Sequence, residues 1–394
     1  MRPAILVRIA LGAGVLALLL PWFGVDKGWA DWPLGRAAPL PVVLAGGAPL
    51  IQASLGWGAA VLAAAALAAI AALLAARGRF GGDAFVAFLV VGASAALAMF
   101  VFLPLATILS AVAYENHAFA PAAAAARLLA PEAWGLGCLA SHEGCGAVWN
   151  SLLLAILAGL LSTLIGLAFA LLAARGEVRA VFLFRAMAIL PLITPPFVVS
   201  LALIVLFGRT GIVTQFLWTA FDIPRSRWIY GLPGVLLAQV LAMAPIAFVL
   251  LEGAVRAIGP SLEEAAATMG ARRFAIFRTV TWPLLKPALA AAFLLGFVES
   301  LADFGNPLVL GGEFEVLSTR IFFAIAGARH EPGRAAGLAI LLLALTLGAF
   351  ALQTLWLGNR RYTTVTGKGD SGLPSPLSRG LKWACGAAAW PWMA

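Results

Sequence analysis

Charged residues are scarce in this chain of 394 residues. Asp, Glu, Lys and Arg together make up 11% of it, whereas hydrophobic residues make up 63%. A typical soluble domain carries about 25% charged residues, so this composition excludes an ordinary soluble fold. The sequence therefore predicts an integral membrane protein, and the length of its apolar runs predicts that it is all-α.

Uncharged runs long enough for membrane helices recur along the chain. Crossing a hydrocarbon core of about 30 Å takes about 20 helical residues. We expect about eight transmembrane helices, of which the seventh is interrupted by Glu299 and Asp303: 9–25, 54–76, 88–113, 147–174, 186–208, 229–251, 288–310 and 335–358.

Composition divides the chain into three parts. Residues 1–83 hold an accessory pair of Ala/Leu-rich spans that ends at the polar stretch GRFGGD. The first span also has features of a cleaved signal peptide, but its long apolar core and the later spans favour an uncleaved helix. Residues 84–358 hold six spans. Residues 359–394 begin as a Gly/Ser/Pro-rich linker and end in an apolar tail too short to cross a bilayer. That tail is either interfacial or the start of a further membrane segment.

Basic residues are dispersed, although the formal net charge is +9. A nucleic-acid interface would gather them into one patch with aromatic residues, so we expect no nucleic-acid partner. If the N-terminus is inside, most Lys and Arg fall in cytosolic segments, as the positive-inside rule requires. We therefore expect a multi-pass protein with cytosolic N- and C-termini.

Cysteine is also scarce, since the chain has three. This number excludes a disulfide-rich scaffold. Cys138 and Cys145 share one predicted outer loop, which is an ordinary loop with or without a disulfide. His142 lies between them, but two thiols and one imidazole without a fourth ligand are weak support for a metal site. We expect no metal.

Catalytic motifs are absent from the sequence. It contains no G-x-x-x-x-G-K-[ST] phosphate loop, no HExxH and no GxSxG. We therefore expect neither an enzyme nor a bound cofactor, and any energy source must lie in another chain.

The most polar loop between two spans covers residues 256–287. Gly259-Pro260 ends the preceding span, and Ser261 and Glu264 have the spacing of a capping box. Gly270 supplies the left-handed position that ends a helix. The pattern predicts a short helix from Leu262 to Met269 with an apolar face made of Leu262, Ala266 and Met269. Such a helix has nothing of its own chain to pack on.

This loop resembles the EAA loop of ATP-binding-cassette importer permeases. Glu264-Ala265-Ala266, three residues, Gly270, nine residues and Val280-Thr281-Trp282-Pro283 match its spacing, although Val280 and Trp282 depart from the family's Ile-x-Leu-Pro ending. The resemblance implies a six-helix type I (MetI-like) permease core whose coupling helix docks on an ATPase. The residues implied in that docking are Leu262, Glu263, Glu264, Ala265, Ala266, Met269, Gly270 and Pro283.

Two further stretches narrow the resemblance. ESLADFGNPLVLGG, from Glu299, and YTTVTGKGD, from Tyr362, resemble the permeases of ferric-iron importers. The resemblance implies import of ferric iron across the bacterial inner membrane, with cytosolic ATPase subunits and a periplasmic substrate-binding protein as partners. Phosphonate, thiamine, polyamine or sulfate are alternative cargoes. A non-transporting scaffold or decayed half-permease is an alternative function.

The sequence contains one EAA loop, which bears on whether a second permease half is needed. Family chains usually hold two six-span halves in tandem, whereas this sequence has one such loop. The resemblance therefore implies a second permease half, which is a further copy, a different chain or a missing tandem half.

A few polar residues and prolines interrupt the predicted spans. Glu299, Asp303 and Asn306 share one face if the helix continues, and they then line a translocation path; if the helix ends near Leu301, both acids lie at the wet interface. Pro195 and Pro196, in LPLITPP, predict a bent segment that lines the path. In the next outer loop, five charged residues are either contacts for the binding protein or a solvated surface: Glu313, Glu315, Arg320, Arg329 and Arg334.

Overall fold

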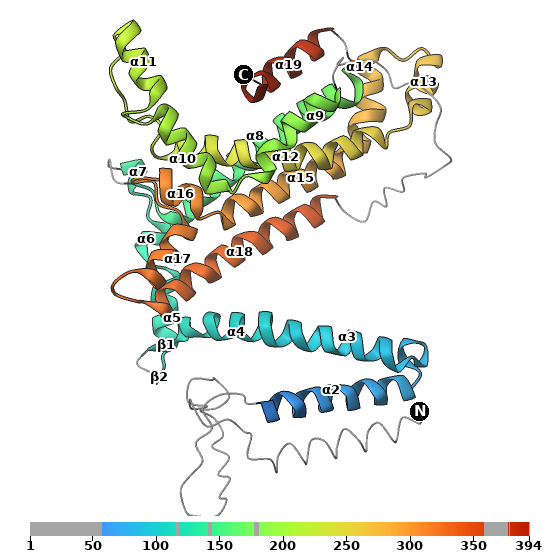
Figure 1. Ribbon diagram of the computed structural model, residues 1–394, viewed down its shortest axis with the longest axis vertical. Helices are drawn as coiled ribbons and strands as arrows, with labels where there is room; N and C mark the ends of the chain where they lie inside the picture. Colours follow the sequence, from blue (N-terminus) through green and yellow to red (C-terminus); the bar gives the residue numbers. More distant parts are fainter. Residues whose placement is uncertain are drawn as a thin grey trace, which may run out of the picture. The chain divides into compact units, whose positions relative to one another are not determined.

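The computed structural model describes residues 57–115, 118–140, 144–176, 181–357, 377 and 379–393. The chain forms two compact units, Met1–Ser110 and Ala111–Ala394 (Figure 1). The predicted span 9–25, His142 and the stretch from Tyr362 lie outside the described residues. The units divide at Ser110, whereas composition predicted a division at residue 83; the functional domain boundary stays a prediction.

The first unit is a helical hairpin. Its described elements are α2 (Trp57–Ala76), η2 (Arg79–Gly82), α3 (Ala84–Leu97), η3 (Ala98–Phe102) and α4 (Leu103–Ser110). Asp83 begins α3, because its carboxylate accepts hydrogen bonds from the amides of Phe85 (2.8 Å) and Val86. Ala71 and Ala75 of α2 pack against Ala87 of α3. The described part of the predicted accessory span 54–76 is thus a helix, α2.

The second unit is nearly all helical in its described part. A short antiparallel pair, β1 (Tyr114–Glu115) and β2 (Ala118–Phe119), follows η4 (Ala111–Ala113). The helical elements after it are α5 (Pro121–Leu128), α6 (Pro131–Trp134), α7 (Gly137–Ala140), α8 (Ala147–Arg175), α9 (Val181–Ile189), η5 (Leu190–Ile193), α10 (Pro196–Phe207), α11 (Ile212–Phe221), α12 (Leu232–Arg256), α13 (Pro260–Thr268), α14 (Arg273–Ile276), η6 (Phe277–Thr281), α15 (Trp282–Ala302), α16 (Gly305–Leu310), α17 (Leu317–Ala326), α18 (Pro332–Leu357) and α19 (Arg379–Met393).

The centre of this unit is the packing of α8 against α12 and α15 (Figure 1). Small residues allow the close approach. A Cβ on Gly166 of α8 would lie 2.6 Å from the Cβ of Ala247 in α12. Phe169, Phe248 and Leu285 fill the core around these crossings. Close contact between small residues is the usual means of helix association in membranes, because lipid supplies no hydrophobic drive.

Six helical stretches among the described residues are long and apolar enough to cross a membrane: Ala84–Ala113, Ala147–Arg175, Phe197–Phe221, Leu232–Arg256, Phe274–Ala302 and Pro332–Leu357. Four of them agree with the predicted spans at 88–113, 147–174, 229–251 and 335–358. The predicted span 186–208 is not one helix. It consists of α9 and η5, a break at Thr194-Pro195, and α10.

That break follows from the prolines. Pro191 lies in the first turn of η5, while Pro195 is the N-cap of α10 and Pro196 its first residue. Proline has no amide hydrogen and cannot continue a helix from the preceding turn, whereas it fits a first turn well. The predicted bend at LPLITPP is therefore present. Pro245, by contrast, lies buried inside the continuous helix α12.

Candidate functional site

The loop between α12 and α15 holds the predicted coupling helix as α13. It begins two residues earlier than the capping box predicted: Gly259 is the N-cap and Pro260 the first helical residue. Ser261 therefore lies inside the first turn, and the predicted Ser261–Glu264 capping box is wrong. A proline in the first turn gives up an amide that has no helical acceptor there, so this start needs no side-chain cap.

The end of α13 is as predicted. Gly270 has φ +84°, and its amide donates to the carbonyl of Ala267 (2.9 Å). The amide of Ala271 donates to the carbonyl of Ala266 (3.1 Å). These two bonds form a Schellman motif, in which a left-handed glycine satisfies the last carbonyls and reverses the chain. Pro283 lies in the first turn of α15, where the chain returns to the bundle.

The predicted apolar face of α13 is divided. Leu262 and Met269 are exposed, with 51% and 81% of their surface open, whereas Ala266 is buried against the protein itself. Glu264 and Ala265 are exposed, and Glu263 is buried. The expectation that this helix has nothing of its own chain to pack on is therefore wrong for Glu263 and Ala266. Its free face consists of Leu262, Glu264, Ala265 and Met269.

Glu263 is buried because it binds two partners from other elements. Its Oε1 accepts hydrogen bonds from Nη1 of Arg175 (2.7 Å) and from the hydroxyl of Thr281 (2.8 Å). Arg175 ends α8, and Thr281 ends η6 directly before α15. Arg175 and Thr281 were not predicted as site residues, because nothing local in the sequence connects a helix end to a carboxylate 88 residues away.

A second polar cluster lies where α15 ends. The helix stops at Ala302, and Asp303 is its C-cap. The carboxylate of Asp303 accepts from Nδ2 of Asn306 (2.7 Å) and from Nε2 of Gln239 in α12 (3.0 Å). Oδ1 of Asn306 accepts from the hydroxyl of Ser200 in α10 (2.6 Å). The cluster therefore ties the break between α15 and α16 to α10 and α12.

This break corrects the shared face expected for Glu299, Asp303 and Asn306. Glu299 lies in the last turn of α15, while Asn306 belongs to α16, so the three residues do not follow one continuous helix. Asn306 is fully buried, and its amide and that of Gln239 bind Asp303. Gln239 was not predicted as a site residue. A lone amide in an apolar run is the feature of the sequence that could have indicated this network. Burying such a group in lipid is costly unless it is paired.

Glu299 lies about one turn beyond the contact between α15 and α8. Gly296, one turn earlier, lies against Gly159, which is ~18 Å along α8 from its first residue at about 1.5 Å per residue. The two helices are antiparallel, since Leu301 packs against Ala155. α15 ends at Ala302, as the alternative of a helix that stops near Leu301 supposed, and the position of Glu299 at a wet interface stays a prediction.

A small cavity of about 10 Å³, room for about one water, lies between α8, α12 and α15. Its lining is apolar except for Ser162 and Glu299. The hydroxyl of Ser162 is buried and finds no hydrogen-bond partner among the described residues. Glu299 itself is exposed. The residues that the structure describes contain no cluster of three or more His, Cys, Asp or Glu that could hold a metal ion.

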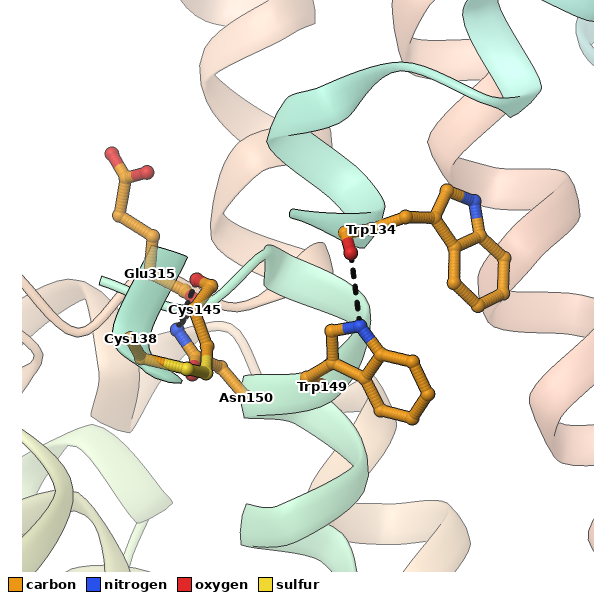
Figure 2. The surroundings of a disulfide bond; sticks show 6 residues. All are labelled: Trp134, Cys138, Cys145, Trp149, Asn150 and Glu315. Carbon is orange, nitrogen blue, oxygen red and sulfur yellow. Dashed lines mark hydrogen bonds between the residues drawn. A yellow bond between two sulfur atoms is a disulfide. The ribbon is translucent and has the colours of Figure 1, made fainter. Parts of the chain in front are cut away.

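At the opposite end of α8, a disulfide joins Cys138 to Cys145 (Figure 2). Nδ2 of Asn150 donates to the carbonyls of Cys145 (3.1 Å) and Glu315 (2.9 Å), so the disulfide loop and the approach to α17 meet at one amide. Trp149 adds a bond from its indole nitrogen to the carbonyl of Trp134 (3.1 Å).

Three of the five charged residues of the predicted outer loop form ion pairs within the chain. Arg320 and Arg334 both bind Glu132 of α6, and Arg320 also pairs with Glu315. Arg334 is bound in addition by Glu331 (3.0 Å). Glu313 and Arg329 are exposed. The ion pairs of Arg320 and Arg334 with Glu132 hold α6, α17 and α18 together. Glu313 and Arg329 are therefore the candidates for contacts with another protein.

These features define a class of protein. A bundle of membrane-spanning helices with a short capped helix held out between two of them is the architecture of a membrane transport permease. The chain belongs to the family of binding-protein-dependent transport system inner membrane components, whose family model matches residues 162–357. It is accordingly a multi-pass membrane protein.

Two curated relatives set the scope of the similarity. The ferric transport system permease protein FbpB of Actinobacillus pleuropneumoniae is 40% identical over 336 residues, which cover 85% of this chain and 47% of that protein. The molybdenum transport system permease protein ModB of Mycobacterium bovis is 32% identical over 231 residues, 58% of this chain and 84% of that protein. The chain thus spans about half the length of the ferric relative.

A solved structure has the same fold. The crystal structure of a bacterial ABC transporter involved in the import of the acidic polysaccharide alginate matches with a TM-score of 0.54 at 19% identity. The match covers 67% of this chain and 93% of that one. At this identity the likeness concerns the fold alone.

Proposed function

We propose that this chain is the permease subunit of an ATP-driven importer for ferric iron. The observation that carries the proposal is α13, nine residues long, with Leu262 and Met269 turned away from their own chain. Two exposed apolar side chains on a short rigid helix suit insertion into the groove of a partner. The sequence has no phosphate loop, so ATP hydrolysis is assigned to a separate cytosolic ATPase subunit.

The mechanism follows from the position of α13 between α12 and α15. Closure of the ATPase halves on ATP would move α13, and the attached helices would rock between inward-open and outward-open arrangements. Leu262, Glu264, Ala265 and Met269 make the docking contacts. Gly270 fixes the reversal that holds them out, and Pro283 fixes the return to the bundle. With α13 docked on a cytosolic ATPase, the eight predicted spans would put both chain termini in the cytosol as well.

The path for the cargo is assigned to the face of α15 that carries Glu299. A carboxylate facing lipid within a span costs about 2.5–3.5 kcal/mol on insertion scales, so its exposed side should meet water or a second permease half. Carboxylate and hydroxyl oxygens suit a hard ferric ion, and Glu299 and Ser162 supply one of each. Few ligands are appropriate, since a conduit must release its cargo. The break at Pro195 and Pro196 and the Asp303–Asn306 cluster border this path and hold its shape.

On the opposite side, Glu313 and Arg329 are proposed contacts for a periplasmic substrate-binding protein. Both are exposed, and Glu315, Arg320 and Arg334 are instead paired within the chain. Charged groups at the rim of such an interface mainly set orientation and association rate.

The proposal is tested by co-expression with the ATPase and binding protein of its own transport system. Purification of the permease should bring down the ATPase, and membrane vesicles loaded with ATP should take up radioactive ferric iron. Gly270→Asp and Glu264→Lys should abolish association or coupling while membrane insertion is intact. Uptake of phosphonate, thiamine, polyamine or sulfate instead of iron would replace the cargo assignment. A chain that binds no ATPase would be a scaffold.

A further inference from the structure

Two adjacent glutamates of α13 have opposite surroundings. Glu264 is exposed, whereas the side chain of Glu263 is 3% exposed. A buried carboxylate in an otherwise open loop costs free energy unless it is paired, so its partners indicate its role. These partners are Arg175, whose side chain is 8% exposed, and Thr281.

The pairing joins three elements at one oxygen atom. Arg175 is the last residue of α8, Glu263 lies in the first turn of α13, and Thr281 directly precedes α15. α8 and α15 are central helices of the bundle, in contact at Gly159 and Gly296. The carboxylate of Glu263 thus links the protruding helix to both central helices, independently of the chain connections at Gly259 and Gly270.

Electrostatics favour this arrangement. A cation in the last turn of α8 and an anion in the first turn of α13 each complement the dipole of their own helix. Burial strengthens the attraction because little water screens it.

We infer that Glu263 is a positioning residue that transmits the movement of α13 to α8 and α15, and that it makes no contact with the ATPase. This inference rests on the proposed function. Without the link, α13 would remain attached through Gly259-Pro260 and through the left-handed turn at Gly270. The ATPase would still dock on Leu262 and Met269, but its closure would move α13 with less effect on the bundle.

The test compares variants in the assembled complex of permease, ATPase and binding protein. Glu263→Ala removes the link, and Thr281→Val removes one of its bonds while Arg175 stays paired. Arg175→Glu combined with Glu263→Arg restores an ion pair with reversed charges. Thr279→Val is the matched control for Thr281→Val, because Thr279 lies two residues earlier, is exposed and donates to the carbonyl of Ala275 in its own loop. Each complex is measured for bound ATPase, ATP hydrolysis and iron transported per ATP.

We expect Glu263→Ala to bind ATPase and hydrolyse ATP while iron transported per ATP falls by about tenfold. Thr281→Val should show a smaller fall, and the charge swap should recover part of the loss. Unchanged transport per ATP in Glu263→Ala would overturn the inference, as would loss of ATPase binding in folded protein. If Glu263→Ala does not fold, the same comparison is made with Thr281→Val, and coupling equal to wild type there overturns it. Failure of the wild-type complex to bind ATPase would instead refute the proposed function.

Discussion

Gly296 of α15 lies directly against Gly159 of α8. A Cβ added to Gly296 would come 3.1 Å from the Cα of Gly159, and one added to Gly159 would come 3.0 Å from the carbonyl oxygen of Phe293. The two backbones touch because neither residue has a side chain. Lipid contributes no hydrophobic force between helices, so such contacts carry much of the packing energy.

The α8–α12 crossing is tighter, and it gives the first prediction. A Cβ on Gly166 would come 2.6 Å from the Cβ of Ala247 and 2.7 Å from the backbone nitrogen of Phe248. Gly166→Ala should therefore force the helices apart and lower stability by about 1–3 kcal/mol. Gly253→Ala in α12 is the control, because a Cβ there meets nothing within 4 Å. Thermal unfolding in detergent measures both; equal midpoints would contradict the packing.

The second prediction separates two acidic residues that the sequence placed together. Asp303→Ala removes the carboxylate that accepts hydrogen bonds from the amides of Asn306 and Gln239, so stability should fall by about 1–3 kcal/mol for each lost bond. Glu299→Gln removes a charge from an exposed side chain and should leave the unfolding midpoint unchanged.

Iron uptake tests the role proposed for Glu299. Glu299→Gln should reduce it, because the proposed path loses its anionic ligand. A Glu299→Gln protein with normal uptake would remove Glu299 from the path. A fully stable Asp303→Ala protein would show that the polar cluster does not hold the helix break.

The third prediction concerns the loop that the disulfide closes. The cysteines are seven residues apart in sequence, and closing a loop of this size stabilises a protein by about 2 kcal/mol in the chain-entropy model. Replacing both cysteines by Ser should lower the unfolding midpoint. Asn150→Ala should have a comparable effect, because it leaves the carbonyls of Cys145 and Glu315 without their shared donor. Dithiothreitol should lower the unfolding midpoint of the wild type and leave that of the double Ser variant unchanged. A wild-type midpoint that dithiothreitol does not change would show that the disulfide is not formed.

The sequence predicted local features well and long-range contacts poorly. The helix stop at Gly270 and the bend at Pro195 follow from backbone constraints of single residues, so they were readable. The capping box was wrong because Gly259-Pro260 offers an equally good start two residues earlier. Arg175, Thr281 and Ser200 were missed because their partners lie 88, 18 and 106 residues away. Helix packing alone brings such residues together, and no local pattern records it.

The proposed function requires that α13 faces the cytosol and docks on an ATPase. Met269→Cys tests it, because 81% of the surface of Met269 is exposed, compared with 51% for Leu262. The background is low: Cys138 and Cys145 are bonded, and burial raises the pKa of the Cys385 thiol, which slows its reaction at neutral pH. Cys385→Ser removes that thiol as well, and Glu313→Cys reports the opposite side.

The decisive measurement is labelling of Met269→Cys by a membrane-impermeant maleimide in vesicles of both orientations. The account predicts labelling in inside-out vesicles, none in right-side-out vesicles, and protection when the ATPase subunit is added. Glu313→Cys should show the reverse orientation and no protection. Labelling of Met269→Cys from the periplasmic side, or labelling that the ATPase leaves unchanged, would contradict the account.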